Sequence, residues 1–262
     1  MKNIYEKLIP LCKSRKNSAL CIVVSVKGST PRKMGAKMIV EEDGKIQGTI
    51  GGGDLEKKVI ENALKTIKNK TPQLFRHDLL HQHNMCCGGT VDIYIEPILK
   101  KDTLYIFGAG HTGQALAKFA TELNFEVVAI DNRKEYLNQI IQPDINKMHL
   151  EFEQALTVLP FDDKTYIAIM TYDHACDRNI LAYCLKKDYA YLGMIGSMRK
   201  VELTKKMFRE AGFASEEELE EVDMPMGIDI KSESPEEIAI SILAKLIITK
   251  NKILSGGVAK YA

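Results

Sequence analysis

The 262-residue sequence has no surplus of either charge, since 36 lysines and arginines stand against 35 aspartates and glutamates. Without a basic surplus we expect no nucleic-acid partner, and without an acidic block we expect no charged tail. The longest apolar run, 238–248, is too short to span a bilayer and contains Lys245, so we expect no membrane partner. Residues 1–6 include an acid and no unbroken apolar stretch, which argues against a signal peptide.

The six cysteines lack the regular spacing of a disulfide framework, which indicates a reducing compartment. We find no internal repeat and no low-complexity segment. What the sequence does contain, 45% hydrophobic and 27% charged residues, is typical of a globular protein. Together these features predict a cytoplasmic location.

The pattern of strands and helices changes near residue 100, after the polar segment 97–102. Residues 1–100 predict a smaller α+β domain, with a strand at 19–26, a hairpin over 37–50, a helix from Asp54, and strands near 73–77 and 91–95. Residues 101–262 alternate strand and helix, which is typical of a doubly wound parallel sheet and predicts a Rossmann-like α/β domain. Its predicted strands are 104–107, 126–130, 166–170 and 190–195, with a weaker strand and helix between 147 and 157. Its predicted helices are 112–123, 178–187 and 199–210, with a last helix that Ser234 caps.

A glycine turn, Gly108-Ala-Gly110-His111-Thr-Gly113, follows the first predicted strand of this domain and opens a helix. The glycines permit a tight turn, backbone approach to a pyrophosphate, and close packing of the helix, so the turn predicts a dinucleotide site. Asp131 ends the next strand, where a carboxylate binds ribose hydroxyls and repels a 2′-phosphate, which favours NAD over NADP. The alternative is a scaffold that retains the turn and binds no dinucleotide.

Two further polar loops follow strands of this domain. Asp173 and His174 could form an acid/base pair, or Asp173 could cap the next helix and leave His174 in solvent. The segment 193–200 contains Ser197 and is a glycine turn with two cations, which suits an anion. Because ligands bind at the carboxyl ends of parallel strands, we predict a polar site at these residues.

Two glycine-rich loops stand out in the first domain. The segment 28–35 contains Thr30, Arg32 and Lys33, so it could surround a phosphate with amides and cations. The segment 48–56 contains Gly51, Gly52 and Gly53 and leads bare backbone into a helix. The alternative for each is a tight connection, with Asp54 as the helix N-cap. Because two such loops exceed what turns need, we predict a ligand site.

Cys86-Cys87-Gly88-Gly89 places a thiol beside flexible backbone, where it could bind a soft metal or carry sulfur as thiolate. With His77, His81 and His83 nearby, zinc is an alternative. The spacing matches no standard zinc module, so we predict no metal site.

Several motifs, spread in order over nearly the whole chain, resemble those of the XdhC/CoxI family of accessory proteins of molybdenum hydroxylases. They are Gly-Ser-Thr-Pro-Arg-Lys-Met-Gly-Ala from Gly28, Gly-Thr-Ile-Gly-Gly-Gly-Asp-Leu-Glu from Gly48, Cys87-Gly-Gly, Gly-Ala-Gly-His-Thr-Gly from Gly108, Met-Thr-Tyr-Asp-His from Met170, Tyr-Leu-Gly-Met-Ile-Gly-Ser from Tyr191, Pro-Met-Gly-Ile-Asp-Ile from Pro225 and Ser-Pro-Glu-Glu-Ile from Ser234.

The resemblance implies a maturation factor and not the hydroxylase itself. Such a factor binds the molybdenum cofactor, helps a cysteine desulfurase to add its terminal sulfur, and passes it to an apo molybdenum hydroxylase such as xanthine dehydrogenase. The family's Cys-Gly-Gly cysteine falls on Cys87. Cys86 and the three histidines are not family hallmarks, which weakens the zinc alternative and leaves the role of Cys86 open.

Combining the resemblance with the residues, we expect the molybdenum cofactor at Thr30, Arg32, Lys33, the 51–53 turn and Cys87. The apolar C-terminal helix makes a homodimer plausible. Two alternatives come from other classes. One is a NAD-dependent oxidoreductase that uses the 108–113 turn with His174 as acid/base. The other is a regulatory protein in which NAD only shifts a conformation.

Overall fold

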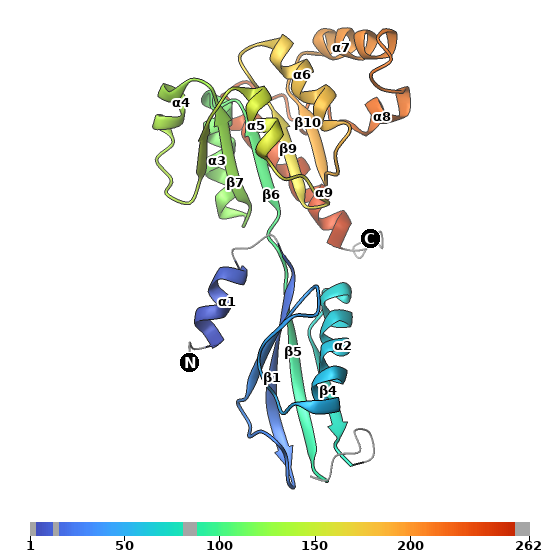
Figure 1. Ribbon diagram of the computed structural model, residues 1–262. Coiled ribbons are helices and arrows are strands. Elements are labelled where there is room, and N and C mark those ends of the chain that lie inside the picture. The colour runs from blue at the N-terminus through green and yellow to red at the C-terminus, as the bar shows by residue number, and fades with distance from the viewer. Residues whose placement is uncertain (1–3, 13–15, 81–87, 255–262) are drawn as a thin grey trace. The chain divides into compact units, whose positions relative to one another are not determined.

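Two separate five-stranded sheets organise the chain, one in each of two units, Met1–Lys101 and Asp102–Ala262. The computed structural model describes residues 4–12, 16–80 and 88–254 (Figure 1). Within these residues, no helix combines the length and the apolar character needed to cross a membrane.

The first unit is an antiparallel sheet with helices, in the strand order β3-β2-β1-β5-β4. β1 alternates side chains between its two faces, as every strand does. Ala19, Cys21 and Val23 point to one face, where they form a core with Leu55 and Val59 of α2. The elements are α1 (Ile4–Cys12), β1 (Ser18–Lys27), β2 (Lys37–Glu41), β3 (Ile46–Gly48), α2 (Gly53–Asn69), β4 (Gln73–Asp78) and β5 (Thr90–Ile98).

The second unit alternates strands and helices. Its strands are β6 (Thr103–Phe107), β7 (Glu126–Asp131), β8 (Asn146–His149), β9 (Thr165–Ile169) and β10 (Tyr191–Met194). Its helices are α3 (His111–Glu122), α4 (Lys134–Gln139), α5 (Phe152–Val158), α6 (His174–Cys184), α7 (Met198–Glu210), α8 (Glu216–Glu221) and α9 (Pro235–Leu254).

All five strands of the second sheet are parallel, in the order β10-β9-β6-β7-β8. Numbered from either edge, the strand that comes first in the chain lies at the centre, as in a Rossmann sheet. The predicted α/β fold with a Rossmann-like second half is therefore confirmed. The strand order reverses between β6 and β9, and the carboxyl ends of these strands are where Rossmann proteins bind ligands.

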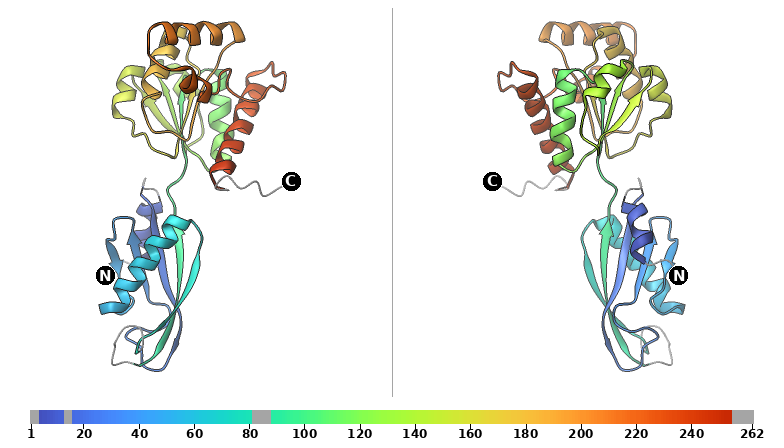
Figure 2. Two further views of the ribbon diagram at one scale, coloured as in Figure 1. Left: turned by 90° about the vertical axis from the view of Figure 1, so that its right-hand side faces the viewer. Right: turned by 90° about the vertical axis from the view of Figure 1, so that its left-hand side faces the viewer.

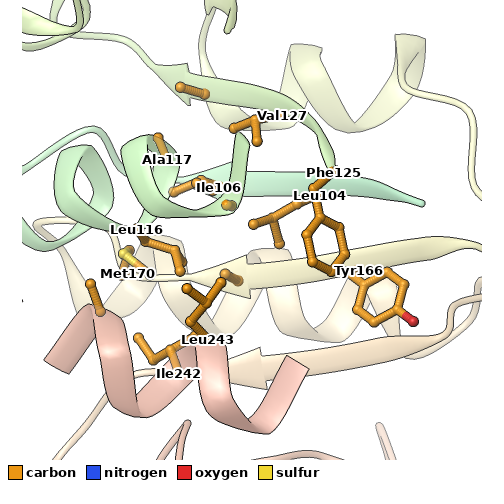
Figure 3. Close-up of a cluster of buried hydrophobic side chains, with 14 of the residues drawn as sticks. Leu104, Ile106, Leu116, Ala117, Phe125, Val127, Tyr166, Met170, Ile242 and Leu243 are labelled. Atoms are coloured by element: carbon orange, nitrogen blue, oxygen red, sulfur yellow. The ribbon is translucent and has the colours of Figure 1, made fainter. Parts of the chain in front are cut away.

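Helices cover both faces of the Rossmann sheet, and Figure 2 shows α3 and α9 side by side on one of them. Leu104 and Ile106 of β6 point to that face and pack with Ile242 and Leu243 of α9 (Figure 3). Tyr105, which lies between them in sequence, points to the opposite core with α5 and α6. The near-continuous apolar strands follow from this burial on both faces.

Two details differ from the sequence prediction. α6 begins at His174, four residues before the predicted start, because Asp173 accepts a hydrogen bond from the backbone of Ala175 (2.9 Å) and caps the helix. The short helices α4 and α8 were not predicted. α8 has a single buried residue, Leu219, and so carries no apolar period.

Candidate functional site

Three glycine-rich segments that are far apart in sequence meet in the first unit. Ser29 forms an isolated bridge with Gly88, which brings the first loop beside the Gly88-Gly89 pair. A Cβ on Gly89 would lie only 2.3 Å from the carbonyl oxygen of Ser29, and one on Gly51 would lie 2.6 Å from Pro31 Cγ. The first loop thus contacts both other segments, through positions where only glycine fits.

The polar side chains of the first loop point to different uses. The Thr30 hydroxyl donates to the carbonyl of Arg32 (3.0 Å), which folds the loop back on itself. Arg32 and Lys33 are exposed, and within the described residues neither side chain has an ion pair or hydrogen bond. Two neighbouring cations without an internal counter-ion are free to bind an anionic ligand.

The second glycine loop already binds a carboxylate of the chain. Glu56 Oε1 accepts hydrogen bonds from the amides of Gly52 (2.9 Å), Ile50 (3.2 Å) and Gly51 (3.3 Å), and another from the Thr49 hydroxyl. Burial acts to raise the pKa of Glu56, but these hydrogen bonds outweigh it and hold the pKa below its usual value. The loop therefore has the geometry of an anion-binding nest, with Glu56 as the anion.

The helix after this loop begins without a side-chain cap. Gly52 is the N-cap, with φ +82°, and Asp54 lies inside the helix with its carboxylate on Lys57 Nζ (3.0 Å). The alternative that Asp54 is the N-cap is therefore wrong. Nothing lies within 4 Å of a Cβ placed on Gly52 or Gly53, so this turn presents open backbone.

The cysteine and histidine predictions fall largely outside the described residues, which omit 81–87. Cys86, Cys87, His81 and His83 lie in that gap. His77 lies in β4, where its side chain is buried. Among the residues that are described, no three His, Cys, Asp or Glu side chains form a metal-binding group.

The Rossmann turn uses its three glycines in two different ways. A Cβ on Gly108 would lie 2.3 Å from the carbonyl oxygen of Met170, and one on Gly113 would lie 2.0 Å from the carbonyl oxygen of Gly108. Gly110 has nothing within 4 Å and an ordinary φ of −66°. The fold therefore requires Gly108 and Gly113 but not Gly110. Beside Gly110, and beside the exposed His111 that opens α3, there is room for a ligand.

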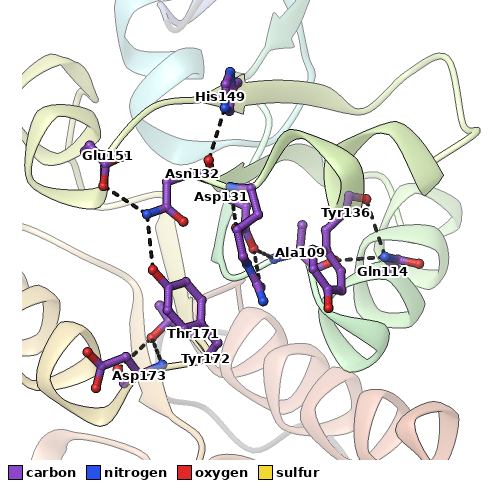
Figure 4. A network of polar contacts seen from close by, with 11 residues as sticks. Ala109, Gln114, Asp131, Asn132, Tyr136, His149, Glu151, Thr171, Tyr172 and Asp173 are labelled. Carbon is purple, nitrogen blue, oxygen red and sulfur yellow. Dashed lines mark hydrogen bonds and ion pairs between the residues drawn. The ribbon is translucent and has the colours of Figure 1, made fainter.

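Asp131 is fully buried at the end of β7 and binds the glycine turn directly (Figure 4). Its Oδ2 accepts from the amide of Ala109 (2.7 Å) and from Arg133 Nη2 (2.9 Å), and its Oδ1 accepts from Arg133 Nε (2.9 Å). Burial acts to raise the pKa of Asp131, but the bonds from Arg133 and Ala109 outweigh it and lower the pKa. Both oxygens serve the chain's own donors, so a ribose would have to compete with Arg133 for this carboxylate.

Arg133 is held between two aromatic rings. Its guanidinium carbon lies 4.0 Å from the ring centroid of Tyr136 and 4.2 Å from that of Tyr172, which is cation–π geometry. Asn132 Nδ2 donates to the Tyr172 hydroxyl (3.2 Å) and to Glu151 (2.9 Å), as Figure 4 shows. These contacts fix the wall of the predicted dinucleotide site beside the turn.

The acid that faces His174 is Asp177, not Asp173. The Asp173 carboxylate caps α6, whereas His174 Nδ1 lies 3.3 Å from Asp177 Oδ2. Asp177 is buried, and its Oδ1 accepts from the amide (2.9 Å) and hydroxyl (2.6 Å) of Thr171. Burial raises the pKa of Asp177, and the hydrogen bonds from Thr171 and His174 oppose that rise. The predicted pairing of Asp173 with His174 is thus corrected in its acid.

Ser197, the last of the predicted polar residues, is the exposed N-cap of α7, and its side chain makes no capping hydrogen bond. The sequence prediction missed Asp177 and Glu56. A signal existed for Asp177, because positions three residues apart share a helix face with His174. No local signal marks Glu56 as the partner of the glycine turn.

Two family models match the chain. The model described as the XdhC Rossmann domain matches residues 104–246. The model described as the XdhC and CoxI family matches residues 11–78. Together they cover most of both units.

Two curated relatives each align with 97% of the chain. YqeB of Escherichia coli (strain K12) is 34% identical over 260 residues, and the chain spans only 47% of that protein. A probable xanthine dehydrogenase component of Bacillus subtilis (strain 168) is 21% identical, with 99% of its length covered. A crystal structure from Bacillus halodurans, described as a xanthine dehydrogenase, has 22% identity and a TM-score of 0.53. The match covers 94% of this chain and 95% of that one, and this likeness shows the fold alone.

Proposed function

Because the chain belongs to the XdhC/CoxI family, we propose that it is an accessory factor that matures a molybdenum hydroxylase of the xanthine dehydrogenase type. In this proposal it binds the molybdenum cofactor as cargo, assists its sulfuration by a cysteine desulfurase, and delivers it to the apo-hydroxylase. Family membership supports the accessory role, and the remaining steps are our proposal.

The meeting of the three glycine-rich segments in the first unit carries this proposal. The cargo has a phosphate and a metal-bound oxyanion, so it needs cations and backbone donors. Arg32 and Lys33 provide the cations, on a loop that contacts Gly51 and Gly89. Glu56 holds the amides of 50–52, so the open backbone at Gly53, where α2 begins, is the more available donor surface.

Cys87 directly precedes Gly88 in the chain, and we assign it the binding of the cofactor's metal or sulfur as thiolate. Thr30, Arg32, Lys33 and the 51–53 turn then hold the anionic groups. The homodimer remains a prediction. It is consistent with exposed isoleucines on α9, namely Ile240, Ile247, Ile248 and Ile253.

A second candidate function rests on the open backbone at Gly110. If a dinucleotide occupies this turn, the Rossmann unit is a NAD-dependent oxidoreductase or a NAD-responsive regulator. The occupied carboxylate of Asp131 speaks against the usual ribose contact. We therefore place this function second.

We expect the purified protein to bind molybdenum cofactor, measured by the fluorescence of the pterin. The chain contains no tryptophan, so its own emission interferes little. Replacing Cys87 by Ala, or Arg32 and Lys33 together by Ala, should weaken binding at least about tenfold, since a hydrogen bond to a charged group contributes about 1.5–3 kcal/mol.

Lys45→Ala is the matched control for this experiment, because Lys45 is an exposed lysine of the same unit that pairs with Asp43 (2.7 Å) at a turn. It should bind cofactor as the wild type does. The proposal fails if the wild type binds no cofactor, or if all three variants bind it equally well.

A further inference from the structure

The second unit contains a small pocket at the carboxyl ends of β9 and β10, between α6 and α7. His174, Asp177 and Arg178 of α6 line it together with Lys200 of α7, and Met194 and Leu203 contribute apolar walls. This edge of a parallel sheet is where ligands bind in such folds. The pocket lies within the Rossmann unit and shares no residue with the glycine loops of the first unit.

The Asp177 carboxylate fixes the orientation of the His174 ring. One oxygen, Oδ1, is bound by the two donors of Thr171, so only Oδ2 is left for the imidazole. An ionised carboxylate only accepts hydrogen bonds, which selects the tautomer with the proton on Nδ1. The other ring nitrogen, Nε2, then carries the lone pair that can accept a proton.

The His174 side chain is half exposed (50%), whereas Asp177 is almost fully buried (2%). A buried carboxylate that orients a solvent-accessible histidine is the arrangement that supports proton transfer in acid/base sites. In the apo geometry such bonds are often long, and the 3.3 Å between Nδ1 and Oδ2 fits that pattern.

The pocket also carries positive charge. Arg178 is partly buried and Lys200 is exposed, and in the part of the chain that the structure describes neither side chain has an ion pair or hydrogen bond. Asp177 is the one acidic residue among the lining residues, and Thr171 and His174 engage its oxygens. The unneutralised groups at the pocket are therefore cationic, which favours an anion.

A phosphate monoester combines the two properties that this pocket matches. It is an anion with several acceptor oxygens, and its second ionisation, with a pKa of about 6, falls in the range where imidazoles change charge. A carboxylate ligand has no proton to give near neutral pH.

We propose that this pocket binds a phosphate monoester, and that His174, positioned by Asp177, accepts the remaining phosphate proton on Nε2. The proton leaves a phosphate oxygen and no covalent bond between heavy atoms changes. The imidazolium that results is stabilised by the Asp177 carboxylate, and the phosphate dianion faces Arg178 and Lys200. Asp177 is a positioning residue, since it acts on the ligand only through His174.

The first test is the protonation pattern of His174, read from the ¹⁵N chemical shifts of its ring in the full-length protein. In Asp177→Asn the two donors of Thr171 must still meet an oxygen, so the new NH₂ group faces Nδ1 and donates to it. The ring proton should therefore move from Nδ1 in the wild type to Nε2 in the variant. Asp173→Asn is the matched control, because asparagine also caps helices, and it should leave the proton on Nδ1.

The second test is calorimetric binding of phenyl phosphate, with inorganic phosphate and the diester dimethyl phosphate as comparison probes. We expect the monoester to bind, and Lys200→Met and Asp177→Asn each to weaken it at least about tenfold. Lys200 is exposed, so its replacement does not disturb folding. Equal affinity for inorganic phosphate would identify free phosphate as a ligand of the same chemistry.

The proposal is overturned if the wild type binds no phosphate probe, if the diester binds as tightly as the monoester, if Lys200→Met binds like the wild type, or if Asp177→Asn leaves the proton on Nδ1. The outcome is independent of cofactor binding, because Cys87→Ala and the Arg32/Lys33 variant leave this pocket intact and should bind phenyl phosphate normally.

Discussion

Gly108→Ala and Gly113→Ala should each destabilise the Rossmann unit by about 3–5 kcal/mol or prevent its folding, since each introduces a backbone clash, to which Gly108 adds strain. Gly108 has φ +109°, and its new methyl group would lie 2.3 Å from the carbonyl oxygen of Met170. At Gly113 the methyl group would lie 2.0 Å from the carbonyl oxygen of Gly108. Neither neighbour is a flexible side chain, so the backbone of β6, β9 or α3 would have to shift.

Gly110→Ala is the matched control in the same turn. Its φ of −66° suits alanine and nothing lies within 4 Å of the added carbon, so stability should fall by no more than about 1 kcal/mol, the cost of a poorer N-cap. Chemical denaturation followed by circular dichroism measures all three variants. A loss at Gly110 as large as at Gly108 would contradict the division of roles. If NAD binds this turn, Gly110→Ala should abolish binding while the fold remains.

Asp131→Ala should lower the free energy of unfolding by about 3 kcal/mol, because it leaves Arg133 and the Ala109 amide without their buried acceptor. Arg133→Met keeps an apolar stem between the two tyrosines but leaves the Asp131 charge uncompensated. The two residues contact each other directly, so the double variant should be less destabilised than the sum of the single variants by about 1–3 kcal/mol. Additive losses would show that the pair does not act together.

The pH dependence of this pair has a definite sign. The folded-state pKa of Asp131 is lowered, so its stabilisation is complete above the unfolded value of about 3.9 and is lost as the pH falls through the folded value. The gap between wild type and Asp131→Ala should therefore narrow below about pH 4. In Arg133→Met, where burial acts without the guanidinium, acid should instead relieve the buried charge. Equal pH profiles for all variants would contradict this account.

The fold of the second unit was predictable because its strands and long helices have strong periodic patterns. The short helices were not. α8 has five glutamates around Leu219, and only its capping box, in which Ser215 and Glu218 exchange hydrogen bonds, marks its start. The start of α6 was misplaced because Asp173, which caps it, was weighed as an acid/base residue.

The candidate sites were predictable as loops but not as hydrogen-bond partners. Glycine spacing alone identified the 51–53 turn and the 108–113 turn. It gave no sign that Glu56 and Asp131 accept hydrogen bonds from the amides of those turns, because such contacts depend on the path of the backbone. The same limit hid Asp177, whose role requires both Thr171 and His174 to lie within reach.

The central claim, that the chain loads molybdenum cofactor into a hydroxylase, is tested most directly by transfer. Purified protein is incubated with molybdenum cofactor and a xanthine dehydrogenase-type apo-hydroxylase, and the hydroxylase activity gained is measured. We predict a clear gain with the wild type and little or none with Cys87→Ala. No gain with either protein, or the same gain with both, would contradict the account.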